Sequence, residues 1–385
     1  MPWLLSVGNA SCRSESIDPA LAKDWLERWE KSILADAEHN RYCDQEMGEE
    51  IGWRVSPFLN GFYYGYLATK EEKWVQHFCD WADSLIKRAV VEPDGHSGWP
   101  KGDGGGGEST EFNADSLLGE AMVMRPIVLM ADLIVKTPAL RGKWKARAQA
   151  YLNVATRNFE KWDKRDAWRE TKEGGVWVVS GFGVDLKTGK WSSGYEQRKT
   201  IGFTNPDNKQ NHIARWLVAM SDVIGKPVYR ERAEKWFRVM KSRLKTHENG
   251  RYLVWNYWEP AGPWDYKPGG EPKHWIGVHP NGGYYQIDAE AITMAFEHGW
   301  VFNKADLDRL IATNRDFMWN QQLKPAKFQR IDGGEVDARW KNSPGLLWAS
   351  LVPHDETLRR IFIANHDPGS WVGLAATPWF LSLPG

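Results

Sequence analysis

The sequence predicts an all-α protein, and specifically an α/α toroid: a barrel of helical hairpins with long loops and a few short strands. Apolar residues recur at three- and four-residue spacing along most of the chain, and short links such as Gly225-Lys226-Pro227 join the resulting helices into antiparallel pairs. Strand patterns are sparse, without βαβ alternation, a GxGxxG motif or a P-loop. An open superhelical solenoid is the competing architecture, but no fixed sequence period supports it.

The first helix is expected at residues 19–40, where Trp25, Trp29, Ile33 and Ala37 form one apolar stripe. Helical hairpins follow at residues 57–68 with 72–90, 113–135 with 139–162, 208–223 with 228–244, 285–299 with 304–319, and a shorter one at 344–350 with 355–365. Small strand hairpins are expected at 176–179 with 190–191 and at 251–257. No linker or low-complexity tract divides residues 1–385, so we expect a single catalytic toroid domain.

Long, glycine-bearing loops separate the hairpins, at about residues 91–112, 163–204, 247–284 and 320–343. In a toroid such loops form a cleft at one end of the inner helices, where function is expected. The chain holds 24 tryptophans, and several stand in these polar stretches. A flat indole ring suits the apolar face of a sugar, so the candidate binding residues include Trp99, Trp258, Trp264 and Trp275. For any single tryptophan, a purely core role is an equal alternative.

Composition excludes several classes of protein. Lys plus Arg equals Asp plus Glu at 50 each, so net charge gives no argument for nucleic acid or an anionic membrane. No apolar run reaches the ~20 residues of a membrane span. The three cysteines lack zinc-site spacing, and Asp94, Asp103 and Glu108 lack EF-hand spacing. We therefore expect no metal, no cofactor and a monomer. The start, MPWLLSVGNASC, has no basic n-region and is a poor secretory signal, although we expect a secreted or periplasmic protein.

The stretch NPDNKQNHIARWLVAM places Asn211, His212 and Arg215 where a helix leaves a turn. Helix N-terminal residues at a cleft present side chains beside free backbone N–H groups, which favours anions. The structural alternative is that Asn211 or Asn208 caps the helix and His212 is a half-buried polar residue.

Further candidates lie on the loops. His279, Tyr284 and Tyr285 surround a Gly-Gly turn at a helix start, and a phenol beside a cation gives up its proton more readily. The alternative is a turn with one core tyrosine and one exposed tyrosine. The glycine-rich stretch 96–115 is expected to form a lid, with Glu111 and Asn113 where the next helix begins. Arg330 and Arg339 are candidates to clamp a carboxylate, although either is also an ordinary surface charge.

A toroid with Asn-His at an inner helix start, then an aromatic-rich stretch and a tyrosine, resembles the polysaccharide lyases that cleave alginate and glucuronan. Asn211-His212 and Trp216 are similar to the Asn-His-then-Trp run of family 5-type alginate lyases, and polysaccharide lyase family 38 is the nearer relative. The motif resemblance covers residues 200–300. The chain departs from the family where an arginine should precede the tyrosine: Lys273, His274 and His279 stand there, so the neutralising cation is left open.

The resemblance implies β-elimination on a 4-linked polyuronate, an anionic polysaccharide. In that reaction Asn211 holds the carboxylate, His212 neutralises it or takes the proton, and a tyrosine, Tyr285 rather than Tyr284, acts as base and then acid. The main rival is an inverting glycoside hydrolase, which needs two carboxylates ~6.5–9.5 Å apart. The pairs available for it are Glu111 or Asp115 with Asp288 or Glu290. A non-catalytic carbohydrate-binding protein is the third possibility.

Overall fold

The computed structural model describes residues 17–101, 112–179, 183–185, 191–192, 202–336 and 347–384. The predicted all-α class is confirmed, because helices dominate and the described strands are two or three residues long. The helices are α1 Pro19–Asn40, α2 Glu50–Arg54, α3 Ser56–Thr69, α4 Glu72–Lys87, α5 Leu117–Lys136, α6 Pro138–Lys164, α7 Asp207–Ile224, α8 Pro227–Arg243, α9 Gly283–Glu297, α10 Lys304–Ala312, α11 Glu356–Asn365 and α12 Gly373–Leu381, with a 3-10 helix η5 at Ala349–His354.

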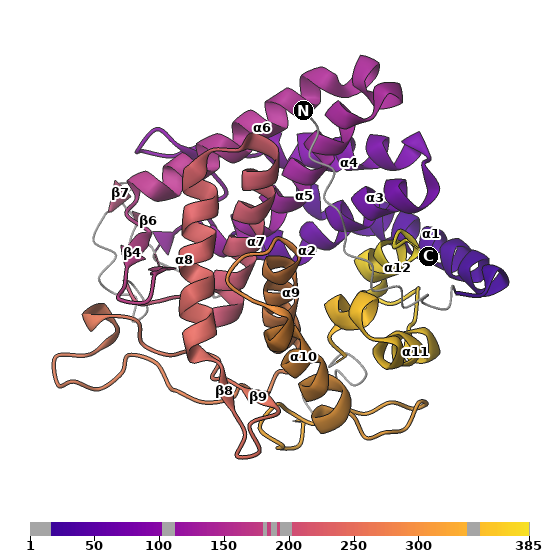
Figure 1. The fold of residues 1–385 in the computed structure, drawn as a ribbon. Helices are drawn as coiled ribbons and strands as arrows, with labels where there is room; N and C mark the ends of the chain where they lie inside the picture. Colours follow the sequence, from indigo (N-terminus) through magenta and orange to yellow (C-terminus); the bar gives the residue numbers. More distant parts are fainter. Residues whose placement is uncertain are drawn as a thin grey trace.

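The helices form an α/α toroid, as predicted. Helices α12, α3, α5, α7 and α9 and the short helix η5 follow one another around the inside, each packed on the next in that order. The second helix of each hairpin packs outside its partner: α4 on α3, α6 on α5, α8 on α7, α10 on α9 and α11 on η5 (Figure 1). The apolar stripe of each outer helix is therefore buried against an inner helix.

The sixth inner–outer pair comes from opposite ends of the chain. Helix α1 lies outside α12, and the indole N–H of Trp29 donates to the carbonyl of Leu374 at 2.9 Å. On the other side, Gly61 of α3 approaches α12 so closely that a Cβ there would lie 2.5 Å from the Leu374 carbonyl oxygen. Helix α12 was not among the predicted elements, because it is short, contains Pro378 and is apolar on nearly every side.

Local signals explain why most predicted bounds agree with the structure. Asp18 caps α1 by accepting from the backbone N–H of Ala20 at 2.9 Å, and Gly225 ends α7 with a φ of 75°. The expected helix at 304–319 is wrong in its second half, because α10 ends at Ala312 and Thr313–Met318 form a π-helical turn.

The predicted strand pairing is partly wrong. The strand β5 (Gly175–Trp177) pairs antiparallel with β4 (Trp168–Glu170) and not with Trp191, and Lys190 lies outside the described residues. Residues 191–192 form β7, which pairs with β6 (Gly183–Asp185). The other pairs are β1 (Val90–Val91) with β2 (Ser97–Gly98), β3 (Phe112–Asn113) with β6, and β8 (Lys245–Thr246) with β9 (Leu253–Val254), the last pair lying in and beside the expected hairpin at 251–257.

The connections between helices differ in length at the two ends of the ring. Short links, such as residues 70–71 and 225–226, lead from an inner helix to its outer partner. The long connections all run from an outer helix to the N-terminus of the next inner helix, so they gather at one end of the toroid. Among the described helices, none combines the length and apolarity that a bilayer span requires.

A buried ionic network fastens one of these long connections to the ring. The ammonium of Lys161 in α6 donates to Asp115 at 2.7 Å and to Glu120 at 2.6 Å. One turn on, Arg165 donates to Asp115 at 3.0 Å and to Glu92 at 3.0 Å. These charges pair with one another inside the protein, which offsets the cost of removing them from water.

Candidate active site

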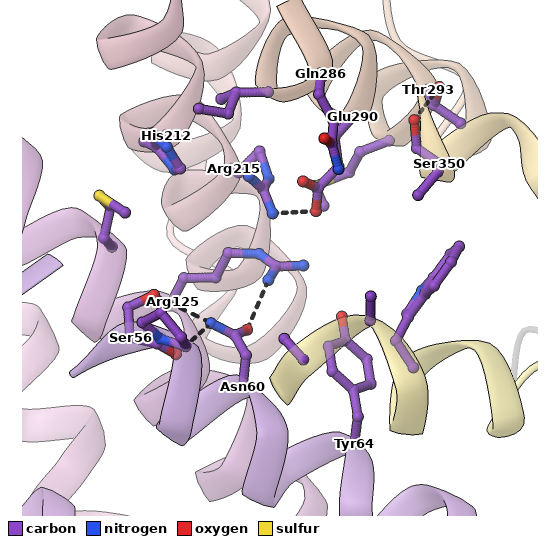
Figure 2. A pocket seen from close by; sticks show the side chains of 18 of the residues that line it. Ser56, Asn60, Tyr64, Arg125, His212, Arg215, Gln286, Glu290, Thr293 and Ser350 are labelled. Carbon is purple, nitrogen blue, oxygen red and sulfur yellow. Dashed lines mark hydrogen bonds and ion pairs between the residues drawn. The ribbon is translucent and has the colours of Figure 1, made fainter. Parts of the chain in front are cut away.

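A cavity of about 480 Å³ lies inside the ring of inner helices, and part of its lining is shown in Figure 2. Side chains from α3, α5, α7, α9, η5 and α12 line it. Its polar residues are Ser56, Asn60, Tyr64, Arg125, His212, Arg215, Gln286, Glu290, Thr293, Glu297 and Ser350. Because every inner helix contributes to the lining, the toroid itself builds the site.

Two arginines from neighbouring inner helices face this cavity (Figure 2). Arg125 of α5 donates to the side-chain oxygen of Asn60 at 3.3 Å and interacts with the Tyr64 hydroxyl, while Arg215 of α7 pairs with Glu290 of α9. The Nε atoms of both arginines have no hydrogen-bond partner among the described residues. Burial lowers the pKa of Arg215 to about 10, against the attraction of Glu290. Two guanidinium groups and one ion-paired carboxylate leave this wall positive.

His212 lies one turn before Arg215 and lines the same cavity. The edge of its ring faces Trp53, with the ring centroids 5.7 Å apart, and within the described part of the chain its Nε2 has no partner. Burial lowers the pKa of His212 well below 6.5, and the charges of Arg215 and Arg125 lower it further. The imidazole is therefore neutral near pH 7, and its Nε2 atom is shielded from solvent.

The expectation that Asn211 faces the cleft beside His212 is wrong. Asn211 is fully buried; its amide donates to Asp288 at 2.7 Å and its oxygen accepts from the Trp236 indole at 2.7 Å. Successive residues on a helix point about 100° apart, and here His212 lines the cavity while Asn211 points into the core. Asn211 joins α7 to α8 and α9, and so helps to fix the helix that carries His212.

Tyr284, Tyr285 and His279 do not line the cavity. Tyr285, the favoured base, is the packed tyrosine: it is 2% exposed, its hydroxyl accepts the backbone N–H of His279 at 2.7 Å, and burial raises its pKa. Tyr284 is half-buried and stacks on Tyr257 with centroids 5.3 Å apart. The structure thus groups Tyr284 and His279 in an aromatic cluster on the loop before α9, apart from His212 and Arg215.

Several other predicted binding residues also lie away from the cavity. Trp258 and Trp99 are buried, and their indole N–H groups donate to the carbonyls of Thr204 at 2.8 Å and Leu85 at 2.9 Å. Their predicted role as open sugar platforms is wrong, because the loops that carry them fold back over the core. Trp264 is half-buried and donates to the Thr204 hydroxyl at 3.0 Å, whereas Trp275 is exposed.

The remaining candidates fall on loops. Arg330 pairs with its neighbour Asp332 and lies outside the cavity lining. Arg339 and Glu111 lie outside the described residues, as do residues 102–110 of the expected lid and the first 16 residues, which include the segment considered as a secretory signal. Asn113 lies in strand β3.

The structure also shows where the carboxylate residues predicted for a hydrolase lie. Asp115 and Asp288 are buried, the first against Lys161 and Arg165 and the second against Asn211 and Trp255. Of the predicted carboxylates, Glu290 alone is in the cavity lining of the described structure, where Glu297 of the same helix joins it.

Sequence reasoning missed Arg125, Tyr64 and Asn60. The signal for Arg125 was present, because it stands in the apolar run LLGEAMVMRPIVLMADLIVK of α5, where a buried cation is costly unless it is paired or used. Tyr64 and Asn60 gave no such signal, since α3 is aromatic and apolar along most of its length.

Fold and site together define the class: an α/α toroid with a cavity inside its ring of inner helices that is lined by two arginines, two glutamates and a histidine. No protein-family model and no curated protein matches the sequence. Among solved structures, a D-mannose isomerase superimposes with a TM-score of 0.51 at 13% identity, covering 95% of this chain and 86% of that one.

Two further structures are equally similar. The cellobiose 2-epimerase from Spirochaeta thermophila DSM 6192 gives a TM-score of 0.51 at 13% identity, covering 95% of this chain and 86% of the other. An inactive variant of the alpha-1,6-mannanase of Salegentibacter sp. HEL1_6, in complex with alpha-1,6-mannotriose, gives 0.51 at 10% identity over 94% and 97% of the two chains. At this identity the likeness shows the fold, which confirms the predicted toroid.

Proposed function

We propose that the protein is a carbohydrate-active enzyme that cleaves a 4-linked, uronate-containing polysaccharide by β-elimination. One observation carries the proposal: Arg125 and Arg215 line a single cavity together with the neutral imidazole of His212. Arginine is suited to bind a carboxylate in bidentate fashion, and both guanidinium side chains belong to the cavity lining. The names of the three similar structures, an isomerase, an epimerase and a mannanase, support a sugar substrate in general.

The chemistry follows from the placement of these groups. The substrate carboxylate binds to Arg125 and Arg215, which neutralise it and stabilise the charge that develops when the adjacent C5 loses its proton. The imidazole of His212 accepts that proton. The electron pair forms the C4–C5 double bond as the C4–O bond breaks, and the Tyr64 hydroxyl, next to Arg125, protonates the leaving oxygen. This assigns to Arg125, Arg215 and Tyr64 the roles that the resemblance gave to Asn211 and Tyr285.

Glycoside hydrolysis is the second candidate, and the likeness to a mannanase favours it over elimination. Glu290 and Glu297 both line the cavity and lie seven residues apart on α9, about 10 Å along the helix. Flexible side chains can bring two such carboxyl groups to the ~6.5–9.5 Å of an inverting pair. In the structure, however, Glu290 is paired with Arg215 and Glu297 with His354, so neither is free.

The two candidates differ in their products. Elimination makes a 4,5-unsaturated end that absorbs in the near ultraviolet, whereas hydrolysis releases reducing ends without that absorbance. We expect new absorbance on at least one of mannuronan, guluronan and glucuronan, and none on neutral α-mannan. Reducing ends released from mannan without absorbance would replace elimination by hydrolysis.

Substitutions test the site itself. Arg125→Met and Arg215→Met should each lower kcat/KM by about 10²–10³-fold, the loss typical when one donor to a developing anion is deleted. His212→Ala removes the base and should lower kcat/KM by about 10²–10⁴-fold. Arg330→Met is the matched control, since Arg330 lies outside the cavity lining, and it should leave turnover unchanged. Loss of activity in the control but not in Arg125→Met would move the carboxylate site to the loops.

A further inference from the structure

The cavity has two unlike walls. The wall formed by α5 and α7 carries Arg125, His212 and Arg215. On α12 the cavity-lining residues Ala375, Ala376 and Trp379 share one face, Val372 precedes the helix and Leu383 follows it, and all five are apolar. Trp371, just before the helix, also lines the cavity.

Two tryptophans bracket two alanines on this apolar wall. Trp371 is 41% exposed although its ring is held edge-on by Tyr42 and Phe58, with centroids 6.2 and 5.7 Å away. Trp379, two helical turns further on, borders the same recess, and Ala375 and Ala376 leave space between the two indoles. One face of a pyranose ring is made of C–H groups, which pack on an indole through the hydrophobic effect and dispersion.

The dimensions of the cavity exceed one sugar ring. Its lining follows α9 from Gln286 to Glu297, twelve residues that span about 16 Å along the helix axis. Its volume of about 480 Å³ lies within the ~300–1,000 Å³ of sites that enclose a drug-sized ligand. A uronate held by Arg125 and Arg215 therefore leaves room for a neighbouring ring.

We propose that Trp371, Trp379 and the alanines between them form a subsite for the sugar next to the uronate, so that the protein recognises a disaccharide unit. This rests on the proposed function for the uronate position. The α12 wall offers apolar surface and no cation among the described residues, so it recognises the second sugar ring through the apolar face of that ring. A neutral hexose suits this subsite as well as a second uronate whose carboxylate points away from the wall.

The test measures binding and needs no turnover. In the full-length His212→Ala protein, calorimetry compares methyl glucuronide with a disaccharide of glucuronate linked to a neutral hexose. We expect the disaccharide to bind at least about tenfold more tightly, and we expect Trp371→Ala to remove most of this gain while leaving the affinity for methyl glucuronide unchanged. Trp379→Leu and the milder Trp379→Phe should reduce the gain in graded fashion.

Trp275→Ala is the control, because Trp275 is similarly exposed but lies outside the cavity lining. The inference is overturned if the gain persists in both the Trp371 and Trp379 variants, if the Trp275 variant loses it equally, or if neither sugar binds. A different result is expected if the proposed function, and not this inference, is wrong. In that case Arg125→Met and Arg215→Met would leave both affinities unchanged, while the tryptophan variants would still remove the gain.

Discussion

At the scale of single residues, the protonation state of His212 decides whether it can act as a base. The histidine is half-buried beside two guanidinium groups, and desolvation first, then Arg215 and Arg125, lower its pKa well below 6.5. We expect its ring signals in an NMR titration to show a neutral imidazole from pH 8 down past pH 6.5. Because a nearby cation disfavours a second positive charge, Arg125→Met should move the titration midpoint upward, toward 6.5. Arg330→Met should not move it. A midpoint near 6.5 in the unmodified protein would show that His212 is solvated.

At the scale of elements, the connection before α5 depends on the buried charges of α6. Replacing Lys161 with Met leaves Asp115 and Glu120 without its two short ion pairs inside the protein, where each side chain is at most 1% exposed. Breaking a buried pair in this way typically costs about 3–5 kcal/mol of unfolding free energy. Lys164→Met, on an exposed position of the same helix, should cost little. Chemical denaturation measures both, and equal midpoints for the two variants would show that the network adds no stability.

Elements with local sequence signals could be predicted from the sequence, and elements without such signals could not. Hairpins such as α7–α8 were predicted to within a residue or two, because helical periodicity, Pro227 and Gly225 are local signals. Helix α12 had no such signal. The site divides in the same way: His212 and Arg215 stood out beside a turn, whereas Asn211 could not be placed, since the choice of face depends on Asp288 and Trp236, far away in the sequence.

At the scale of the whole molecule, two glycines should respond oppositely to the same change. Gly61→Ala would put a Cβ 2.5 Å from the Leu374 carbonyl oxygen and 2.6 Å from Ile33, where α1, α3 and α12 meet. This overpacking should cost about 1–3 kcal/mol and lower turnover by displacing α12. Gly142→Ala meets no atom within 4 Å on an exposed position of α6, so it should stabilise the protein by about 0.5–1 kcal/mol. Thermal melts compare the two, and a Gly61→Ala protein as stable as the unmodified one would show that the junction can yield.

The pairing of α1 with α12 also determines when, during synthesis, the ring of helices can be completed. Trp29 and Leu374 are 345 residues apart in the chain, and α12 leaves the ribosome after every other described helix. Until then α1 lacks its main inner partner, and the cavity lacks the wall that carries Trp379. The entropy of closing so long a loop grows only slowly with its length, but contacts between distant residues slow folding. A nascent chain can therefore stack its first hairpins early, whereas the ring closes and the cavity gains its last wall only after α12 has been made.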